Sequence, residues 1–181
     1  KDFVYSNLGT IYFFQARYAD AAKMYQKALE LSDDDYVVWA HYAESCYWTP
    51  GERDKASAIY QVAISLAEKE LEKDPNNCAI LADLASYYSM MGNVPKSLSL
   101  LEKVIELKPS TVRVVFRIGE TYEQLGKRDE ALKWIKAALD MGYPVAKIDR
   151  YPGLRYLRAD ERFMRLREVV RDERQSQARH Q

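Results

Sequence analysis

One short pattern recurs four times along the chain and constrains the fold more than any other feature. A small residue is followed by a large residue four positions later and by another small or β-branched residue three further on. The pattern occurs at 21–28, 56–63, 97–104 and 131–138, so successive copies start 35, 41 and 34 residues apart. A nearly fixed period of this size indicates stacked copies of one supersecondary unit, because a single copy cannot bury its apolar face alone.

A second amphipathic segment precedes each copy. It contains Gly or Ala followed three residues later by Tyr or Cys, at 9–12, 43–46, 85–88 and 119–122. Small residues let two helices approach closely, and the larger side chains fill the space beside them. Each unit is therefore predicted to be a helix-turn-helix pair. The second helix of the second unit is predicted to run on through AISLAEKELEKDP, residues 63–75, with Ile64, Ala67 and Leu71 on one apolar stripe.

With both segments in register, the sequence resembles the tetratricopeptide repeat family, whose 34-residue unit has an aromatic-xx-Leu-Gly-xx-Tyr first helix and an Ala-xxx-Phe-xx-Ala second helix. The resemblance implies an all-α fold, a right-handed superhelical solenoid of four helix-turn-helix units plus C-terminal capping helices. The predicted boundaries are four units at 2–35, 36–76, 77–110 and 111–143, a cap at 144–172, and a disordered tail at 173–181.

The period is lost after Pro144, and the segment that follows is interpreted as the cap. Asp160 is expected to begin a helix there with an apolar face formed by Phe163, Leu166 and Val170. The sequence from the second unit to this cap also resembles the C-terminal tetratricopeptide segments of bacterial multidomain signalling proteins of the serine/threonine kinase or adenylate cyclase type. That resemblance implies a larger signalling protein with a catalytic or DNA-binding domain upstream.

Composition argues against several functions. The 27 basic and 27 acidic side chains balance, so the molecule as a whole does not attract nucleic acid or anionic membranes. Cys46 and Cys78 are the only cysteines, and two histidines complete a ligand set too sparse for a zinc site. The sequence contains none of the phosphate-binding, dinucleotide-binding, serine-hydrolase or zinc-protease motifs. We therefore predict a protein that is not an enzyme and uses no cofactor or metal.

Reduced cysteines make the cytoplasm the expected compartment. No segment approaches the roughly 20 apolar residues that cross a bilayer, so no membrane partner is predicted for this chain. Because the sequence begins with Lys, a signal or anchor that precedes it would not be visible.

The resemblance also implies where a partner binds. In this family the first helices line a concave groove that takes up peptides, and the predicted function is a noncatalytic protein-interaction module or scaffold. The family's groove positions correspond here to Asn7, Thr10, Phe13, Phe14, His41, Glu44, Trp48, Asp83, Ser86, Arg113, Arg117 and Glu120. Aromatic side chains at one end and two arginines at the other suit a partly apolar peptide with an acidic portion. The aromatic residues could instead be packed between repeats.

Two alternative functions stay open from the sequence. The groove or cap could receive a helix of a second copy, which would make the chain a self-association module. Nucleic acid could bind the basic C-terminal end, although interleaved carboxylates dilute its charge. The arginines of that end are Arg155, Arg158, Arg162, Arg165, Arg167, Arg171, Arg174 and Arg179.

Overall fold

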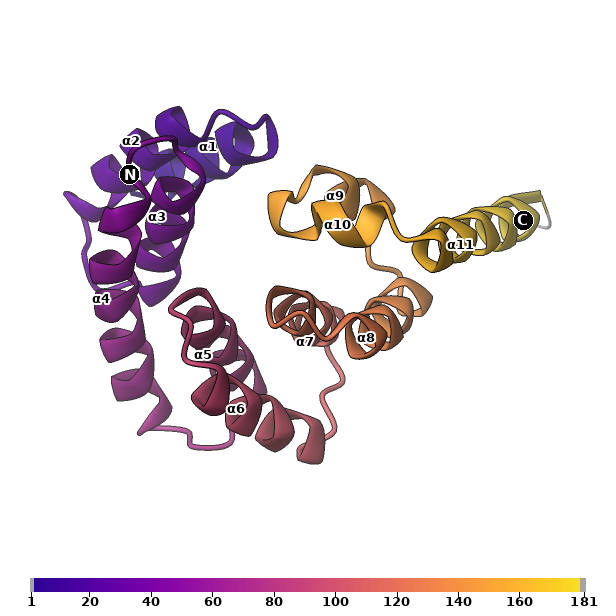
Figure 1. Ribbon diagram of the computed structural model, residues 1–181. Helices are drawn as coiled ribbons and strands as arrows, with labels where there is room; N and C mark the ends of the chain where they lie inside the picture. Colours follow the sequence, from indigo (N-terminus) through magenta and orange to yellow (C-terminus); the bar gives the residue numbers. More distant parts are fainter. Residues whose placement is uncertain (1, 180–181) are drawn as a thin grey trace.

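The computed structural model is a curved row of helices (Figure 1). It describes the backbone of residues 2–179 and the side chains of residues 2–171. Four helix pairs occupy most of this range: α1 (Asp2–Phe14) with α2 (Tyr18–Leu29), α3 (Tyr36–Trp48) with α4 (Arg53–Leu71), α5 (Cys78–Met90) with α6 (Val94–Glu106), and α7 (Val112–Gln124) with α8 (Arg128–Asp140). The final elements are α9 (Val145–Arg150), the 3-10 helix η1 (Pro152–Leu154), α10 (Arg155–Arg158) and α11 (Glu161–Arg179). The predicted all-α solenoid with a helical cap is confirmed.

Small residues set the close approach of the two helices within a pair. Gly119 on α7 lies against α8, where a Cβ atom added to it would come within 2.9 Å of the backbone nitrogen of Ile135. Gly9 plays the same part on α1, but there the added atom would meet the ring of Tyr25 at 2.9 Å. The small residue that opens each repeated pattern, such as Ala21 or Ala131, is fully buried on the facing helix.

Replacing Gly119 with alanine is therefore expected to lower the free energy of unfolding by about 1–2 kcal/mol, because the α8 backbone must move to admit a methyl group. Thermal denaturation followed by circular dichroism would measure the loss. Gly9→Ala is the matched comparison, and its effect should be smaller, because the ring of Tyr25 can shift more easily than a helix backbone. Equal stability of Gly119→Ala and the parent chain would contradict the role given to this glycine.

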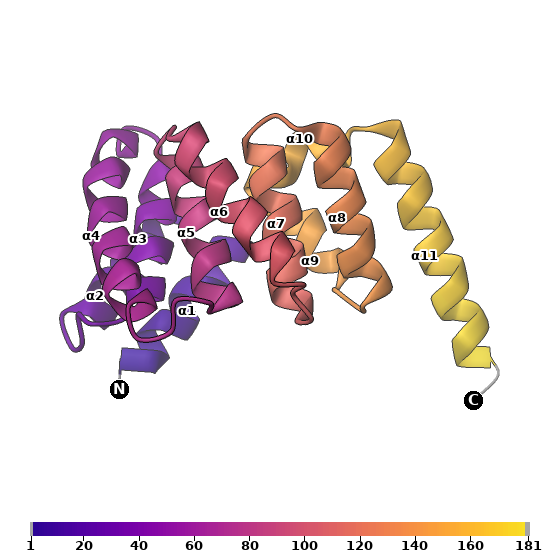
Figure 2. The same cartoon turned by 90° about the horizontal axis from the view of Figure 1, so that it is seen from below.

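The pairs stack so that the row bends into an open ring around a hollow centre (Figure 1). Neighbouring units pack through α2 with α3, α4 with α5, and α5 with α7. The two ends of the chain lie at opposite ends of the row (Figure 2). Helix α4 is 19 residues long, whereas α3, α5 and α7 have 13. The predicted extension of this helix is thus present as far as Leu71, and its buried side includes Ile64 and Ala67. Among the described helices, none combines the length and apolar character needed to cross a bilayer.

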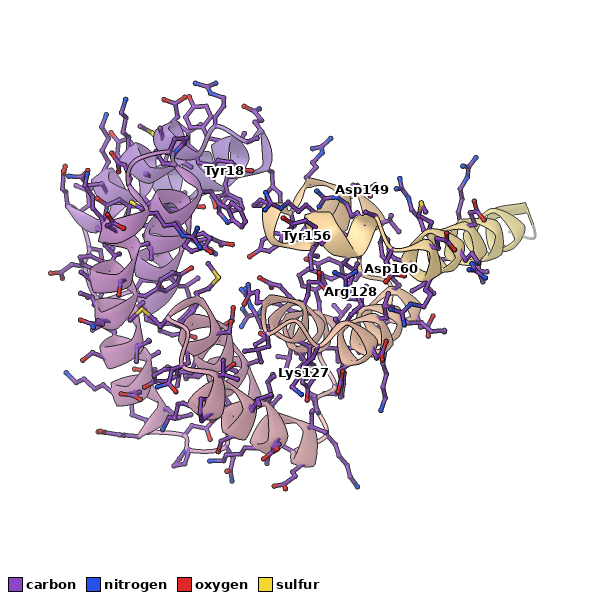
Figure 3. All side chains as sticks on the ribbon, viewed as in Figure 1. Tyr18, Lys127, Arg128, Asp149, Tyr156 and Asp160 are labelled. Carbon is purple, nitrogen blue, oxygen red and sulfur yellow. The ribbon has the colours of Figure 1, made fainter. Side chains whose placement is uncertain are left out.

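Ion pairs attach the cap to the fourth helix pair. Arg128 binds Glu123 at 2.6 Å and Asp160 at 3.3 Å, and Figure 3 shows Arg128 and Asp160 meeting where the cap joins α8. Asp160 also accepts a hydrogen bond from the backbone N–H of Arg162 at 2.9 Å, so it begins α11 as predicted. Phe163 and Val170 are buried beneath that helix. Helix α11 runs to Arg179, so residues 173–179 are helical where we predicted disorder, and residues 180–181 lie outside the described part.

Candidate functional site

The concave side of the ring contains a cavity of about 630 Å³. Side chains from α1, α2, α3, α7 and the segment after α8 line it, so the first two helix pairs meet the fourth pair and the cap there. Eight of the twelve predicted groove residues lie in its wall: Thr10, Phe13, Phe14, His41, Glu44, Arg113, Arg117 and Glu120.

The other four predicted residues lie outside this wall. Asn7 is exposed on α1, and Ser86 is buried beside a smaller neighbouring cavity. Trp48 packs between Tyr18 and Tyr47, with ring centroids 6.4 and 5.2 Å away, so it belongs to the packing between repeats. Asp83 is buried behind the wall, where it holds two of the cavity arginines.

Aromatic rings form the apolar part of the wall. Phe116 stacks on Tyr143 with ring centroids 3.9 Å apart and meets the edge of Tyr151 at 6.4 Å. Across the cavity, Phe13 lies 6.1 Å from the same Tyr151 and 5.9 Å from Phe14. Tyr151 therefore connects the aromatic residues of the first pair with those of the fourth.

Tyr151 also makes a polar contact that joins the cap to the second helix pair. Its hydroxyl donates a hydrogen bond to a carboxylate oxygen of Glu44, a residue of α3 that is 107 positions away in the sequence. Arg158 holds the turn that carries Tyr151, because its guanidinium donates to the carbonyl oxygens of Tyr151 at 2.6 Å and Ile148 at 3.0 Å. One side chain of the cap is thus fixed against the second helix pair.

A charge network lies beneath the cavity floor. Arg117 pairs with Asp83 at 3.2 Å and with Glu120 at 2.9 Å. Arg113 donates to the same Asp83 at 3.3 Å, and Gln124 donates to Glu120 at 3.2 Å. Both carboxylates are buried, and Arg117 together with Arg113 balances the charges that the fold has removed from water.

This network changes the interpretation of the two arginines. Arg117 is engaged in ion pairs with Asp83 and Glu120, and its side chain is mostly buried. The side chain of Arg113, in contrast, is 52% exposed. Lys147 of the cap is exposed at the same cavity. The cations that a bound molecule can reach are therefore Arg113 and Lys147.

Glu44 and His41 are two of the wall residues whose pKa values are strongly shifted. Burial, reinforced by the nearby Glu120 carboxylate, raises the pKa of Glu44 well above its usual range. Burial and the positive charge of Arg117 lower the pKa of His41 to about 4. The Nδ1 atom of His41 is buried without a hydrogen-bond partner. At neutral pH the imidazole is therefore uncharged.

The carboxylates of the wall are held by contacts with neighbouring side chains. Tyr151 binds Glu44, while Arg117 and Gln124 bind Glu120, so both carboxylates serve to hold the wall together. Within the described residues, no cluster of three or more His, Cys, Asp or Glu is arranged to hold a metal ion.

Family models place these helix pairs among known proteins. Two models, each described as a tetratricopeptide repeat, match residues 3–35 and 82–144. The chain belongs to the tetratricopeptide repeat family. No curated protein matches the sequence significantly.

Solved structures with similar folds include a putative kinesin light chain with nearly identical TPR-like repeats from Podosopora anserina. It is 16% identical, the match covers 97% of this chain and 95% of that one, and the TM-score is 0.52. TTC0263, a thermophilic TPR protein of Thermus thermophilus, is 17% identical over 95% and 98% of the two chains, with a TM-score of 0.51. The protein MamA is 26% identical over 77% of each chain, with a TM-score of 0.43. The first two show that the tetratricopeptide fold extends over nearly the whole chain.

The tetratricopeptide pattern could not indicate the cap residues in the cavity. Lys147 and Tyr151 line it, yet they lie where the period has ended. The sequence marks this segment only by the end of the repeat period and by Pro144 and Pro152, which indicate turns. Nothing in that signal says that the segment returns toward α3.

Three of the described arginines at the basic C-terminal end are held by contacts within the chain. Arg158 is bound to backbone carbonyl groups, while Arg162 pairs with Asp129 at 2.6 Å and Arg167 with Asp149 at 2.9 Å. The side chains of Arg174 and Arg179 lie outside the described residues.

Proposed function

We propose that this tetratricopeptide repeat chain is a noncatalytic interaction module that binds an extended segment of a partner protein in the concave cavity. The observation that carries this proposal is the convergence of eight groove positions on one cavity with aromatic walls. The predicted place of the chain in a cytoplasmic signalling protein stays a prediction.

The wall chemistry favours an apolar side chain accompanied by a carboxylate. Phe14 and Tyr143 offer partly exposed ring surfaces on which an apolar or aromatic side chain would lose water, and Phe116 supports Tyr143 from behind. Arg113 and Lys147 are the accessible cations at the same cavity, while Arg117 together with Arg113 balances the charges of Asp83 and Glu120. A guanidinium fork pairs well with carboxylate oxygens, so an acidic group of the ligand is expected to lie near Arg113.

Selection of peptides from a random displayed library on the immobilised chain would test the proposal. Binding of a selected peptide would then be measured by fluorescence anisotropy. Phe14→Ala and Arg113→Ala are each expected to weaken it by about tenfold or more, since truncation of a binding hot spot costs over about 1 kcal/mol.

The matched controls are Tyr156→Ala and Arg165→Ala, which remove an exposed aromatic residue and an exposed arginine outside the cavity. Neither should change the affinity. Equal loss in the cavity variants and the controls, or failure to select any peptide, would count against cavity binding. Circular dichroism of each variant would establish that the helices remain folded.

A further inference from the structure

The first helix has an uncovered apolar face. In the internal units, the position equivalent to Val4 is occupied by Val38, Ile80 and Val114, and all three are buried. Val4 itself is 55% exposed. The difference arises because α3, α5 and α7 each pack on the preceding unit, whereas α1 is the first described helix.

A second position on the same helix shows the same difference. Ser45, Tyr87 and Thr121 are buried at the internal positions equivalent to Ile11, yet Ile11 is 53% exposed. Phe3 is also exposed. Exposed apolar side chains at positions that are buried by stacking in the other units indicate a surface that another helix covers.

The exposed residues of α1 form one stripe. At 3.6 residues per turn, the exposed positions of α1 span about 100° around the helix axis. They are Phe3, Val4, Asn7 and Ile11. Asn7 is the polar member, and Phe3 and Ile11 lie four residues before and after it. We call these four residues the α1 stripe.

The last helix of the row, α11, exposes a different kind of surface from α1. Helix α11 buries Phe163 and Val170, and the side directly opposite carries exposed Glu161, Arg165 and Glu168. The described side of α11 that faces away from the buried residues is therefore mainly charged, with exposed Met164 and Val169 at its edges. It would be a poor partner for the α1 stripe, which makes end-to-end stacking of copies unfavourable.

We infer that the α1 stripe is the interface with a second copy of this chain, packed as two antiparallel α1 helices related by a two-fold axis near Asn7. A two-fold interface requires a self-complementary surface, and here Phe3 of one copy faces Ile11 of the other and the reverse. The amide of Asn7 has both donors and an acceptor, so two copies of it can satisfy each other at the axis.

Charges beside the stripe fit the same symmetry. Lys27 and Glu30 of α2 line a hollow together with Val4 and Leu31, and neither makes an ion pair within the described residues. In a dimer with two-fold symmetry, Lys27 of each copy can form an ion pair with Glu30 of the other copy, which gives two equivalent ion pairs. The interface leaves the cavity free, because no residue of the α1 stripe lines it, so it does not depend on the proposed peptide-binding function.

Sedimentation equilibrium over a range of chain concentrations would test the inference. The parent chain is expected to dimerise, and Val4→Glu and Ile11→Glu are each expected to raise the dimer dissociation constant by about a hundredfold, because each places like charges near the axis. Val169→Glu, at an equally exposed valine on α11, is the matched control and should dimerise like the parent.

Cross-linking would test the position of the axis. Asn7→Cys should form a covalent dimer under mild oxidation, whereas Lys23→Cys, on an exposed position of α2, should not. A chain that stays monomeric at every concentration, or a dimer unaffected by glutamate at Val4 and Ile11, would overturn the inference.

Discussion

Replacing Arg117 with methionine is expected to lower the free energy of unfolding by about 3–5 kcal/mol, because removing one partner of a buried ion pair leaves uncompensated charge. Its two partners, Asp83 and Glu120, each have side chains only 1% exposed. Methionine fills most of the volume of the arginine side chain, so the loss of stability is due to the missing charge and not to poorer packing. Denaturation by urea, monitored by circular dichroism, would measure it.

Two further variants separate charge from other effects. Arg113→Met removes the half-exposed arginine from the same Asp83 while Arg117 stays in place, and it should cost less than about 1 kcal/mol. The triple variant Arg117→Met, Asp83→Asn, Glu120→Gln removes all three charges together and should recover much of the lost stability. If the triple variant is no more stable than Arg117→Met alone, the buried network is not the reason for the loss.

Part of this network follows from the repeat period. Asp83 and Arg117 are 34 residues apart, so they occupy the same position of successive units, where the structure places them in contact. Opposite charges at one position of neighbouring first helices predict an ion pair between those helices. The helix pairs and the buried small residues follow from the period for the same reason, because all these contacts lie within one unit or between adjacent units.

Contacts between distant units could not be predicted in this way. Glu44 and Glu120 also share one position, but the unit between them has the small Ser86 there, and only the curvature of the whole row brings the two carboxylates near each other. The bond from Tyr151 to Glu44 requires both that curvature and the path of the aperiodic cap. Small rotations accumulate from unit to unit, and the sequence of any one unit does not fix their sum.

The raised pKa of Glu44 leads to a second large effect. Glu44→Gln is expected to stabilise the protein by about 2 kcal/mol at about pH 8, because glutamine removes a charge whose burial is unfavourable but still accepts a hydrogen bond from Tyr151. For a chain of this length, such a gain corresponds to a rise in Tm of about 4–8 °C.

The pH dependence of this gain has a definite sign. A carboxyl group with a raised pKa in the folded state holds its proton more tightly there than in the unfolded chain, where it ionises near 4.5. The folded protein is therefore penalised as the pH rises above that value, and the penalty is complete once Glu44 ionises in the folded state. The advantage of glutamine should be absent below about pH 4.5 and largest in mildly alkaline solution.

His41 supplies an internal check on this profile. Its lowered pKa, about 4, means that protonation favours the unfolded chain, so its contribution to stability rises with pH between about 4 and 6.5. In the parent chain this rise opposes the penalty from Glu44 over much of the same range. In Glu44→Gln the histidine acts without that opposition, so the stability of the variant should climb more steeply with pH than that of the parent. Glu102→Gln, which removes an exposed carboxylate on α6, should follow the parent profile. Parallel profiles for Glu44→Gln and the parent would show that Glu44 ionises alike in the folded and unfolded states, contrary to its position in the closed ring.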